Sequence, residues 1–199
     1  MTNRAVIVDS GVANITSVRA ALARLGVDVV VSANSDIISN ADRVVLPGVG
    51  SAAAAMEQLK SKGLVDVIRK LTQPVLGICL GMQLLFESSE ESGGADCLNL
   101  IEGKVRMIEA GVGMPVPHMG WNRLSKIANH PLLDGVQEGD YVYFVHSYAA
   151  EIGGYTLAAC EYGAEFSAVV GQDNFFGCQF HPERSGKTGA RILKNFMEM

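Results

Sequence analysis

The sequence has no long hydrophobic run. Its longest apolar stretches, such as residues 43–47 and 74–79, fall far short of the roughly 20 residues that a helix needs to cross a bilayer. The N-terminus, Met1 to Arg4, leads directly into an apolar segment, without the longer apolar stretch and small-residue cleavage site of a secretory signal. We therefore expect a cytoplasmic protein with no membrane span.

The sequence also has no basic cluster. Its 16 lysine and arginine residues are outnumbered by 21 aspartate and glutamate residues, which gives a net charge of −5. No segment combines concentrated lysine and arginine with interleaved aromatic residues, the pattern that is typical of nucleic-acid-binding surfaces. Nucleic acid is therefore not an expected partner.

Cysteine is scarce and widely spaced. The four cysteines, Cys79, Cys97, Cys160 and Cys178, include no C-x-x-C pair, so their spacing predicts neither a zinc site nor a disulfide framework. No P-loop motif for binding phosphates is present either. We therefore expect free thiols and no metal or other cofactor.

The length of 199 residues, 48% of them hydrophobic, suits one sizeable core and is short for two, so we expect a single domain over residues 1–199. The first half alternates apolar runs with helical patterns, which predicts a parallel sheet covered by helices. Gly26 is expected to end the first of these helices, as glycines at helix C-termini commonly do. Strands are expected at residues 5–9, 27–32, 42–48 and 73–79, and helices at 14–26, 51–63 and 80–92.

The second half has a different pattern. Residues 110–122 contain so many glycines and prolines that we expect a long structured loop there. After it, short β-rich runs separated by turn residues predict antiparallel or mixed strands. A last segment, 187–199, is an expected amphipathic helix. The β-rich runs cover residues 141–150, 155–163, 165–172 and 175–181.

The stretch Gly77–Gly81 places one cysteine, Cys79, between two glycines at the point where a predicted strand meets a predicted helix. This spacing is typical of a nucleophile elbow, in which the nucleophile adopts a strained backbone conformation and the flanking glycines leave room for the turn. A helix N-terminus would favour the thiolate of Cys79, and the backbone N–H of Leu80 could stabilise an oxyanion. Such a site suits acyl transfer. The alternative interpretation, a small buried hydrophobic residue, is the one we expect for the other three cysteines.

A cysteine nucleophile needs a base, and the sequence has four histidines. His130 has the pattern of a surface turn. His118 and His146 could be either structural residues or the base. His181 ends an apolar run and is followed by Pro182 and Glu183. In an extended backbone the carboxylate of Glu183 can reach one imidazole nitrogen, which leaves the other for Cys79. The two motifs together predict a Cys-His-Glu triad.

The segments GICLGMQ (77–83) and QFHPE (179–183) resemble those of the class I (triad) glutamine amidotransferases. The resemblance covers nearly the whole chain, and within this family it is to the glutaminase subunits of imidazole glycerol phosphate synthase, an enzyme of histidine biosynthesis. The motifs that carry this closer resemblance are IVDSGVANITSV (7–18), LPGVG (46–50), PHMGWN (117–122), YFVHSY (143–148) and FHPERSG (180–186).

The resemblance implies an α/β fold, a single domain with a mixed, largely parallel sheet and helices on both faces, in the flavodoxin-like architecture of that family. It implies that Cys79 attacks the side-chain carboxamide of glutamine, that His181 transfers protons and that Glu183 orients His181. The products would be glutamate and ammonia, formed through a thioester.

The resemblance also implies an oxyanion hole and a glutamine pocket. The oxyanion donors would be the backbone N–H groups of Leu80 and of Val49 in the LPGVG segment, which could also be only a tight turn before the next helix. Residues that match glutamine-binding positions of the family are Gly50, Gln83, Ser147 and Tyr148. Gln83 could equally be an ordinary helix residue, and residues 143–148 a core strand.

A protein partner is implied as well. In the family, ammonia passes to a (β/α)8-barrel synthase subunit, and the matching interface positions here are Asn14, Met119, Trp121 and Arg184. Ordinary core packing is the alternative for Met119 and Trp121. Arg184 stands where many members carry lysine, and Ser10 and Ala13 replace the family's more usual aromatic residue and glycine.

Three other functions remain open. The closest is the amidotransferase subunit of another pathway, such as anthranilate, aminodeoxychorismate or pyridoxal phosphate synthesis, against which the segments 117–122 and 181–186 argue. A cysteine peptidase could use the same triad, but it needs an open groove rather than a closed pocket. A domain that only binds a partner would not need the intact Cys79, His181 and Glu183.

Overall fold

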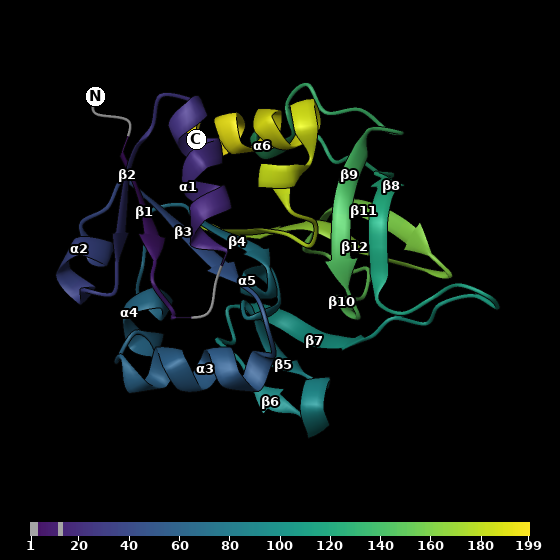
Figure 1. The fold of residues 1–199 in the computed structure, drawn as a ribbon, viewed down its shortest axis with the longest axis horizontal. Coiled ribbons are helices and arrows are strands. Elements are labelled where there is room, and N and C mark those ends of the chain that lie inside the picture. Colours follow the sequence, from purple (N-terminus) through teal and green to yellow (C-terminus); the bar gives the residue numbers. More distant parts are fainter. Residues whose placement is uncertain (1–3, 12–13) are drawn as a thin grey trace.

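The computed structural model describes residues 4–11 and 14–199, so Ala13 lies outside the described residues. A seven-stranded sheet in the order β11-β12-β13-β4-β3-β1-β2 forms the centre of the fold (Figure 1). The five strands from β13 to β2 are parallel, and β12 and β11 add an antiparallel end. These strands are β1 (Arg4–Val8), β2 (Asp28–Ser32), β3 (Arg43–Gly48), β4 (Val75–Cys79), β11 (Thr156–Tyr162), β12 (Ala164–Gln172) and β13 (Phe175–Cys178).

Helices cover both faces of this sheet, as the resemblance implied (Figure 1). Neighbouring side chains of β1 enter different cores, Ile7 on one face and Val6 and Val8 on the other, because successive strand residues point to opposite faces. On the Ile7 side lie α1 (Ile15–Arg24) and α6 (Gly186–Glu198). On the opposite side lie α2 (Ser35–Ser39), α3 (Ala52–Ser61) and α4 (Val65–Arg69).

The elements expected in the first half up to β4 are confirmed within one or two residues at each end. Gly26 ends α1 with φ 76° and donates its N–H to Ala23 O at 3.0 Å, so the expected glycine stop is also confirmed. The parallel strands follow the order β2-β1-β3-β4-β13, which is the flavodoxin-like order. In such sheets ligands bind beyond the carboxyl ends of the strands, where β4 delivers Cys79.

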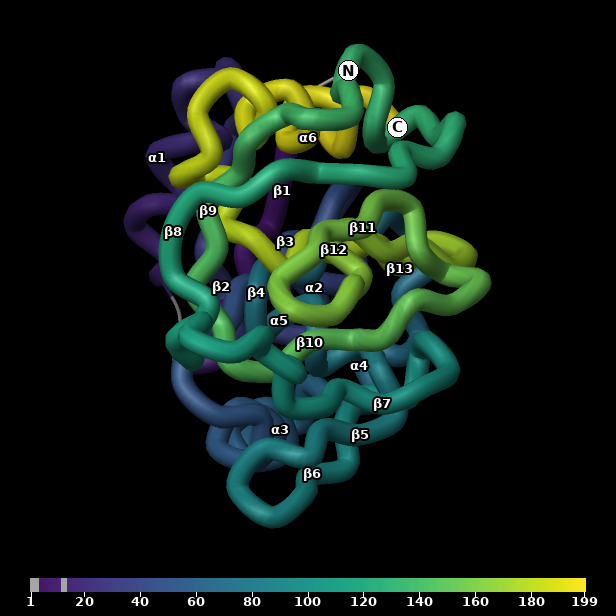
Figure 2. Tube along the Cα trace, turned by 90° about the vertical axis from the view of Figure 1, so that its right-hand side faces the viewer, coloured from purple at the N-terminus to yellow at the C-terminus, as the bar shows by residue number. Residues whose placement is uncertain are grey.

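Two smaller sheets complete the fold. A four-stranded sheet, in the order β10-β7-β5-β6, lies at the end of the molecule that carries α3 (Figure 2). A two-stranded antiparallel sheet pairs β8 with β9. Their bounds are β5 (Phe86–Ser89), β6 (Ala95–Asp96), β7 (Ile101–Met107), β8 (His118–Arg123), β9 (Tyr141–His146) and β10 (Tyr148–Ala150). Three short 3-10 turns are η1 (Glu91–Gly93), η2 (Pro131–Leu133) and η3 (Pro182–Arg184).

The helix expected at residues 80–92 is wrong. Only one turn forms, α5 (Leu80–Gln83), before the chain continues as β5. The carbonyls of Leu84, Leu85 and Phe86 accept backbone hydrogen bonds from residues 98–101 instead of from the next helical turn. Tertiary partners thus replace the helical hydrogen bonds, and they place the Phe86 side chain in the core.

The loop expected at residues 110–122 ends earlier than predicted. Residues 118–122 belong to β8, where Met119 is paired with Val145 of β9. Pro117 lies just before the strand, where its missing N–H removes no hydrogen bond of the ladder. Gly120 tolerates a φ of 138° within the strand, so the glycine and proline content did not prevent pairing.

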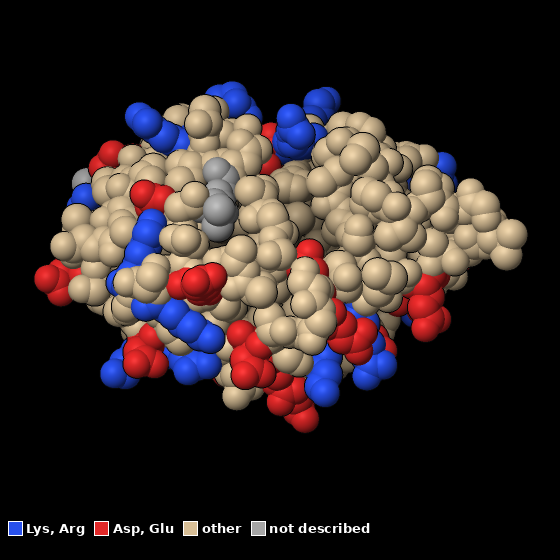
Figure 3. All heavy atoms as spheres, turned by 60° about the horizontal axis from the view of Figure 1, so that its bottom comes forward, with Lys and Arg blue, Asp and Glu red and all other residues tan. Residues whose placement is uncertain are grey.

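On the face drawn in Figure 3, lysine and arginine side chains are interspersed with aspartate and glutamate side chains. None of the helices among the described residues is both long and apolar enough to cross a membrane.

Replacement of Gly81 by alanine is expected to destabilise the fold. A Cβ at this position would lie 1.8 Å from Leu46 O, so β3 and α5 would have to separate at a cost of roughly 1–3 kcal/mol in the free energy of unfolding. Gly154→Ala is the control, because nothing lies within 4 Å of its added Cβ. Urea titration followed by circular dichroism measures both. Equal midpoints for the two variants would contradict the expectation.

Candidate active site

Cys79 is the last residue of β4, and its backbone has the strained geometry expected of a nucleophile elbow. Its φ of 54° and ψ of −112° lie outside the regions that side-chain-bearing residues prefer. Gly81 and Gly77 make this turn possible. A Cβ on Gly81 would meet Leu46 O at 1.8 Å, and a Cβ on Gly77 would meet Gly81 O at 2.6 Å. The interpretation of Gly77–Gly81 as an elbow is therefore confirmed.

The helix that follows Cys79 is shorter than the sequence predicted, since α5 has only one turn. A helix of one turn has only a small macrodipole. A backbone carbonyl and a side-chain amide provide the polar contacts of Cys79. Its Sγ lies 3.7 Å from Val145 O and 4.0 Å from Gln179 Nε2.

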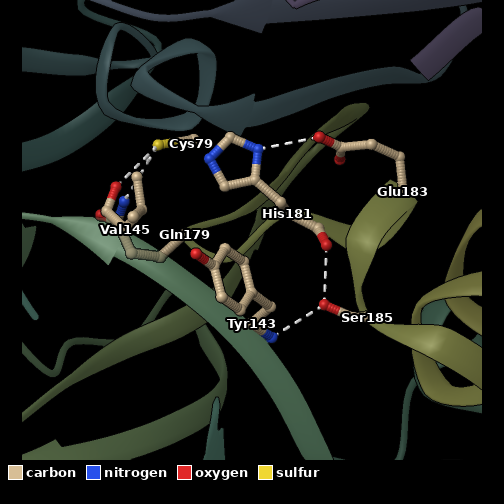
Figure 4. A network of polar contacts seen from close by, with 7 residues as sticks. All are labelled: Cys79, Tyr143, Val145, Gln179, His181, Glu183 and Ser185. Carbon is tan, nitrogen blue, oxygen red and sulfur yellow. Dashed lines mark hydrogen bonds and ion pairs between the residues drawn. The ribbon is translucent and has the colours of Figure 1, made fainter. Parts of the chain in front are cut away.

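His181 lies between Cys79 and Glu183, with one ring nitrogen toward each (Figure 4). His181 Nδ1 is 2.9 Å from Glu183 Oε1, as the sequence predicted. The expected extended backbone at this point is wrong, because residues 182–184 form the 3-10 turn η3. Pro182 has the fixed φ that suits the first position of such a turn, and the turn still brings the carboxylate onto the ring.

Backbone contacts fix the position of His181. Its N–H donates to Tyr143 O at 2.9 Å, and its carbonyl accepts from Ser185 Oγ at 2.7 Å (Figure 4). Ser185 Oγ in turn accepts from Tyr143 N at 2.9 Å. β9 and the start of α6 therefore hold the histidine from both sides.

The charge state of His181 follows from its neighbours. Burial by itself lowers the pKa of the imidazole, but hydrogen bonds with Cys79 and Glu183 and the charges of both groups raise the pKa to about 10. The Glu183 side chain is fully buried, so solvent does not weaken its interaction with the ring. The imidazole therefore carries a proton at neutral pH.

A cavity of about 250 Å³ opens beside Cys79 and His181. It is smaller than the roughly 300–1,000 Å³ of sites for drug-sized ligands, and its size suits a single amino acid. All the residues that were predicted for the oxyanion hole and the glutamine pocket line this cavity. Other residues, which the sequence did not indicate, line it as well. The predicted ones are Val49, Gly50, Leu80, Gln83, Ser147 and Tyr148, and the others are Glu91, Pro117, Val145 and His146.

Polar contacts order the wall of this cavity. Gln83 Nε2 donates to Tyr148 O at 2.8 Å and to Gln179 Oε1 at 3.1 Å, so its side chain makes tertiary contacts at the cavity. Glu91 is the one acidic side chain that lines the cavity among the described residues. Its Oε2 accepts the N–H of Ala52 at 2.6 Å, at the start of α3.

Sequence reasoning missed Gln179 and Glu91 for different reasons. Gln179 is a fully buried amide in the apolar run before His181, and a polar residue in such a run was the signal that could have indicated it. Glu91 lies in η1 on an irregular segment, where no periodicity points to the cavity.

A larger hollow, of about 510 Å³, lies beside η2 and the end of α6. It contains none of the residues predicted for the site, and of the histidines only His130 lines it. The nucleophile and its base therefore mark the smaller cavity as the candidate active site.

The four predicted interface residues do not line the active-site cavity. Asn14 is the N-cap residue of α1. Met119 and Trp121 are 65% and 55% exposed, so core packing does not explain them. Trp121 packs against the Tyr143 ring at 6.0 Å, and the Arg184 guanidinium lies 5.9 Å from the centre of the same ring.

The remaining cysteines have the buried structural role that the sequence predicted. Burial raises the pKa of Cys97 to about 11 and that of Cys160 to about 12, and it also raises the pKa of Cys178. These thiols are therefore protonated and unreactive at neutral pH. Within residues 4–11 and 14–199, no group of three or more histidine, cysteine or acidic side chains is arranged to hold a metal ion.

Comparisons with known proteins identify relatives of this chain. The chain is 55% identical to the imidazole glycerol phosphate synthase subunit HisH of Shewanella loihica, in a match that covers 98% of this chain and 90% of the relative. It is also 55% identical to the subunit of that name from Salmonella typhimurium, with 98% of each chain covered.

A solved structure described as a glutamine amidotransferase superimposes with a TM-score of 0.75 over 97% of both chains. At 19% identity this likeness shows the fold alone. The sequence profile of the family "Glutamine amidotransferase class-I" matches residues 6–199. The chain that carries this cysteine elbow and its histidine therefore belongs to the class-I glutamine amidotransferases.

Proposed function

We propose that this protein is the glutaminase subunit of an imidazole glycerol phosphate synthase, built as one amidotransferase domain over residues 1–199. The observation that carries the proposal is the strained Cys79, which meets the pair His181–Glu183 beside a cavity the size of one amino acid. The 55% identity to subunits named HisH supports the choice of pathway.

In the proposed reaction, the sulfur of Cys79 forms a bond to the carboxamide carbon of glutamine, and the carbonyl oxygen becomes an oxyanion. When the C–N bond breaks, protonated His181 gives its proton to the leaving nitrogen, which departs as ammonia. Water then attacks the thioester while His181 accepts a proton from it. The C–S bond breaks, and glutamate and the starting Cys79 are released.

The oxyanion would be stabilised by the backbone N–H groups of Leu80 and Val49. Support comes from the sheet register, in which Gly48 of β3 is paired with Cys79 of β4. The residues that follow this pair, Val49 and Leu80, leave the sheet at the same edge and both line the cavity. Gly50 has a φ of 88°, which lets the segment turn there.

The amino-acid part of the substrate would bind on the opposite wall. Gln83, Ser147 and Tyr148 offer neutral polar groups, with Gly50 beside them. Glu91 would bind the α-ammonium group, because among the described residues its carboxylate is the only one that lines the cavity. A peptidase is disfavoured, since a cavity of about 250 Å³ leaves no room for an extended chain.

The ammonia would pass to a (β/α)8-barrel synthase subunit, with which this chain forms a cytoplasmic heterodimer. Free ammonia is mostly protonated at neutral pH, so a protected route keeps it nucleophilic. We assign the docking face to Met119, Trp121, Tyr143 and Arg184, together with Asn14, the N-cap residue of α1. The exposed apolar surface of Met119 and Trp121 and the relatives' designation as subunits support this assignment.

Cys79→Ala is expected to reduce glutamate release from glutamine by roughly 10³-fold or more, because the covalent intermediate cannot form. In the complex with the barrel subunit, synthesis with added ammonia is expected to stay intact. Cys160→Ala is the matched control, since that thiol is buried away from the cavity and should retain activity. Loss of both reactions in a folded Cys79→Ala complex would contradict the proposed division of labour.

Glu183→Gln is expected to lower the pKa of His181 below its value of about 10, because a carboxylate that stabilises the imidazolium is lost. Glutaminase activity is expected to fall by about 10³-fold. NMR titration of the histidine ring protons measures the pKa, with His130 as an internal control whose pKa should not move. An unchanged His181 titration would show that Glu183 does not act on the ring.

The same substitution tests the pH dependence of stability. A raised folded-state pKa means that His181 contributes stability in full below its unfolded pKa of about 6.5, and that this contribution is lost as pH rises through about 10. The difference in unfolding free energy between wild type and Glu183→Gln should therefore be larger at pH 6 than at pH 10. Denaturant titrations at both values measure it, and a difference that grows with pH would refute the assigned charge.

Trp121→Ala is expected to weaken binding of the barrel subunit by about tenfold or more, because a large exposed aromatic side chain is a typical interface hot spot. Ile37→Ala on α2 is the control, since Ile37 is also exposed but lies at the far end of the sheet from β8 (Figure 1). Isothermal titration calorimetry gives both affinities. Equal affinities would move the docking face elsewhere.

A further inference from the structure

A chain of buried and partly buried hydrogen bonds runs from β8 to the wall of the active-site cavity. Asn122 Nδ2 lies 3.3 Å from His118 Nε2, and His118 Nδ1 lies 3.1 Å from His146 Nε2. His146 Nδ1 lies 2.9 Å from Tyr148 O. The triad mechanism uses none of these three side chains, and His118 and His146 are buried.

The contacts assign the proton positions along this chain. A carbonyl oxygen only accepts, so His146 Nδ1 must carry the proton that it donates to Tyr148 O. In a neutral ring His146 Nε2 is then an acceptor, and His118 Nδ1 must be its donor. His118 Nε2 accepts in turn from the amide of Asn122. Every contact is satisfied only if both imidazoles are neutral and protonated on Nδ1.

Aromatic packing fixes the orientation of His118. Its ring is stacked on Tyr162, with centroids 3.9 Å apart, and on Phe144, with centroids 4.8 Å apart. His146 meets the edge of Phe166 at 5.0 Å. Rings packed in this way are held in one orientation, so they can hold a neighbouring group in place.

The electrostatic environment agrees with neutral rings. Burial lowers the pKa of His118 to about 4. For His146, burial and then the nearby charges of His118 and His181 lower the pKa to about 3, although the hydrogen bond to Tyr148 O opposes this shift. Neither histidine is therefore suited to proton transfer at neutral pH.

The group that this chain holds belongs to the proposed glutamine pocket. Tyr148 O accepts from both His146 Nδ1 and Gln83 Nε2, and Ser147 O accepts from Ile108 N at 2.9 Å. These bonds fix the corner between β9 and β10. In the described part of the chain, no hydrogen bond occupies the Ser147 hydroxyl, which lines the cavity and remains available for a ligand.

We propose that His118 and His146 are positioning residues, which act through Tyr148 O to hold the Ser147–Tyr148 segment in the geometry that binds glutamine. This inference rests on the proposed function. His118 and Asn122 lie on one side of β8, while the alternate residues Met119 and Trp121 are exposed on the other. The strand that carries the docking face thus also carries the first members of the chain.

Two substitutions at one position separate this role from a general structural one. His146→Leu removes the donor to Tyr148 O, whereas the amide of His146→Asn can still provide one. In the complex with the barrel subunit, His146→Leu is expected to raise the KM for glutamine about tenfold with a smaller change in kcat. His146→Asn should restore most of the affinity. His118→Phe, which keeps an aromatic ring between Tyr162 and Phe144, should also raise the KM.

The assigned tautomers have an independent test. Long-range ¹H–¹⁵N NMR spectra should show both His118 and His146 as neutral rings protonated on Nδ1 at pH 7. His130→Phe is the control for the kinetics, because His130 lies outside the cavity and should leave the KM unchanged.

The outcomes are distinguishable from one another. If wild type releases no glutamate from glutamine with its partner, the proposed function is wrong. If wild type is active and the KM values for glutamine of both His146→Leu and His146→Asn lie within twofold of the wild-type value, the positioning role is wrong. A charged or Nε2-protonated His146 in the spectra would also overturn it. If His146→Leu and His146→Asn lose thermal stability to the same extent and have equal KM values for glutamine, His146 has a structural role only.

Discussion

The contact of α5 with β3 is the constraint on which the active site depends. Gly81 lies so close to Leu46 O that any side chain there would push β3 and α5 apart, and this close approach accompanies the reversal of the chain at Cys79, which has a positive φ. The same reversal directs Gln83 toward Tyr148 and leaves the sulfur at the carboxyl edge of the sheet. A single close approach of two backbones thus places the nucleophile and one wall of the cavity.

Neighbouring groups, rather than burial, give the buried histidines different chemical roles. Burial lowers the pKa of His181 and of His146 alike. His181 has a fully buried carboxylate and Cys79 as neighbours, and these reverse the effect, so its ring is charged. His146 faces a carbonyl and a second imidazole, so its ring stays neutral. Two imidazole rings at one cavity can therefore have different roles, His181 as a proton donor and His146 as a positioning residue.

The fold was predictable wherever local pattern and tertiary contacts agree. The parallel strands and α1, α3 and α6 follow from apolar periodicity and from stops such as Gly26. Residues 84–92 and 118–122 were misassigned, because their backbone groups pair with segments far away in the sequence. β7 (Ile101–Met107) gave no recognised signal, since only part of one face is buried against its neighbours.

The sequence by itself indicated the elbow at Cys79 and the pairing of His181 with Glu183, since the glycine spacing and the His-Pro-Glu order are local patterns, whereas the close approach of Gly81 to Leu46 O belongs to the tertiary structure. Only the tertiary structure decided that Gln179 contacts Cys79 and Gln83 and that Glu91 lines the cavity, because such contacts depend on sheet register and on burial. Those properties arise from the whole folded chain, and no local stretch of sequence contains them.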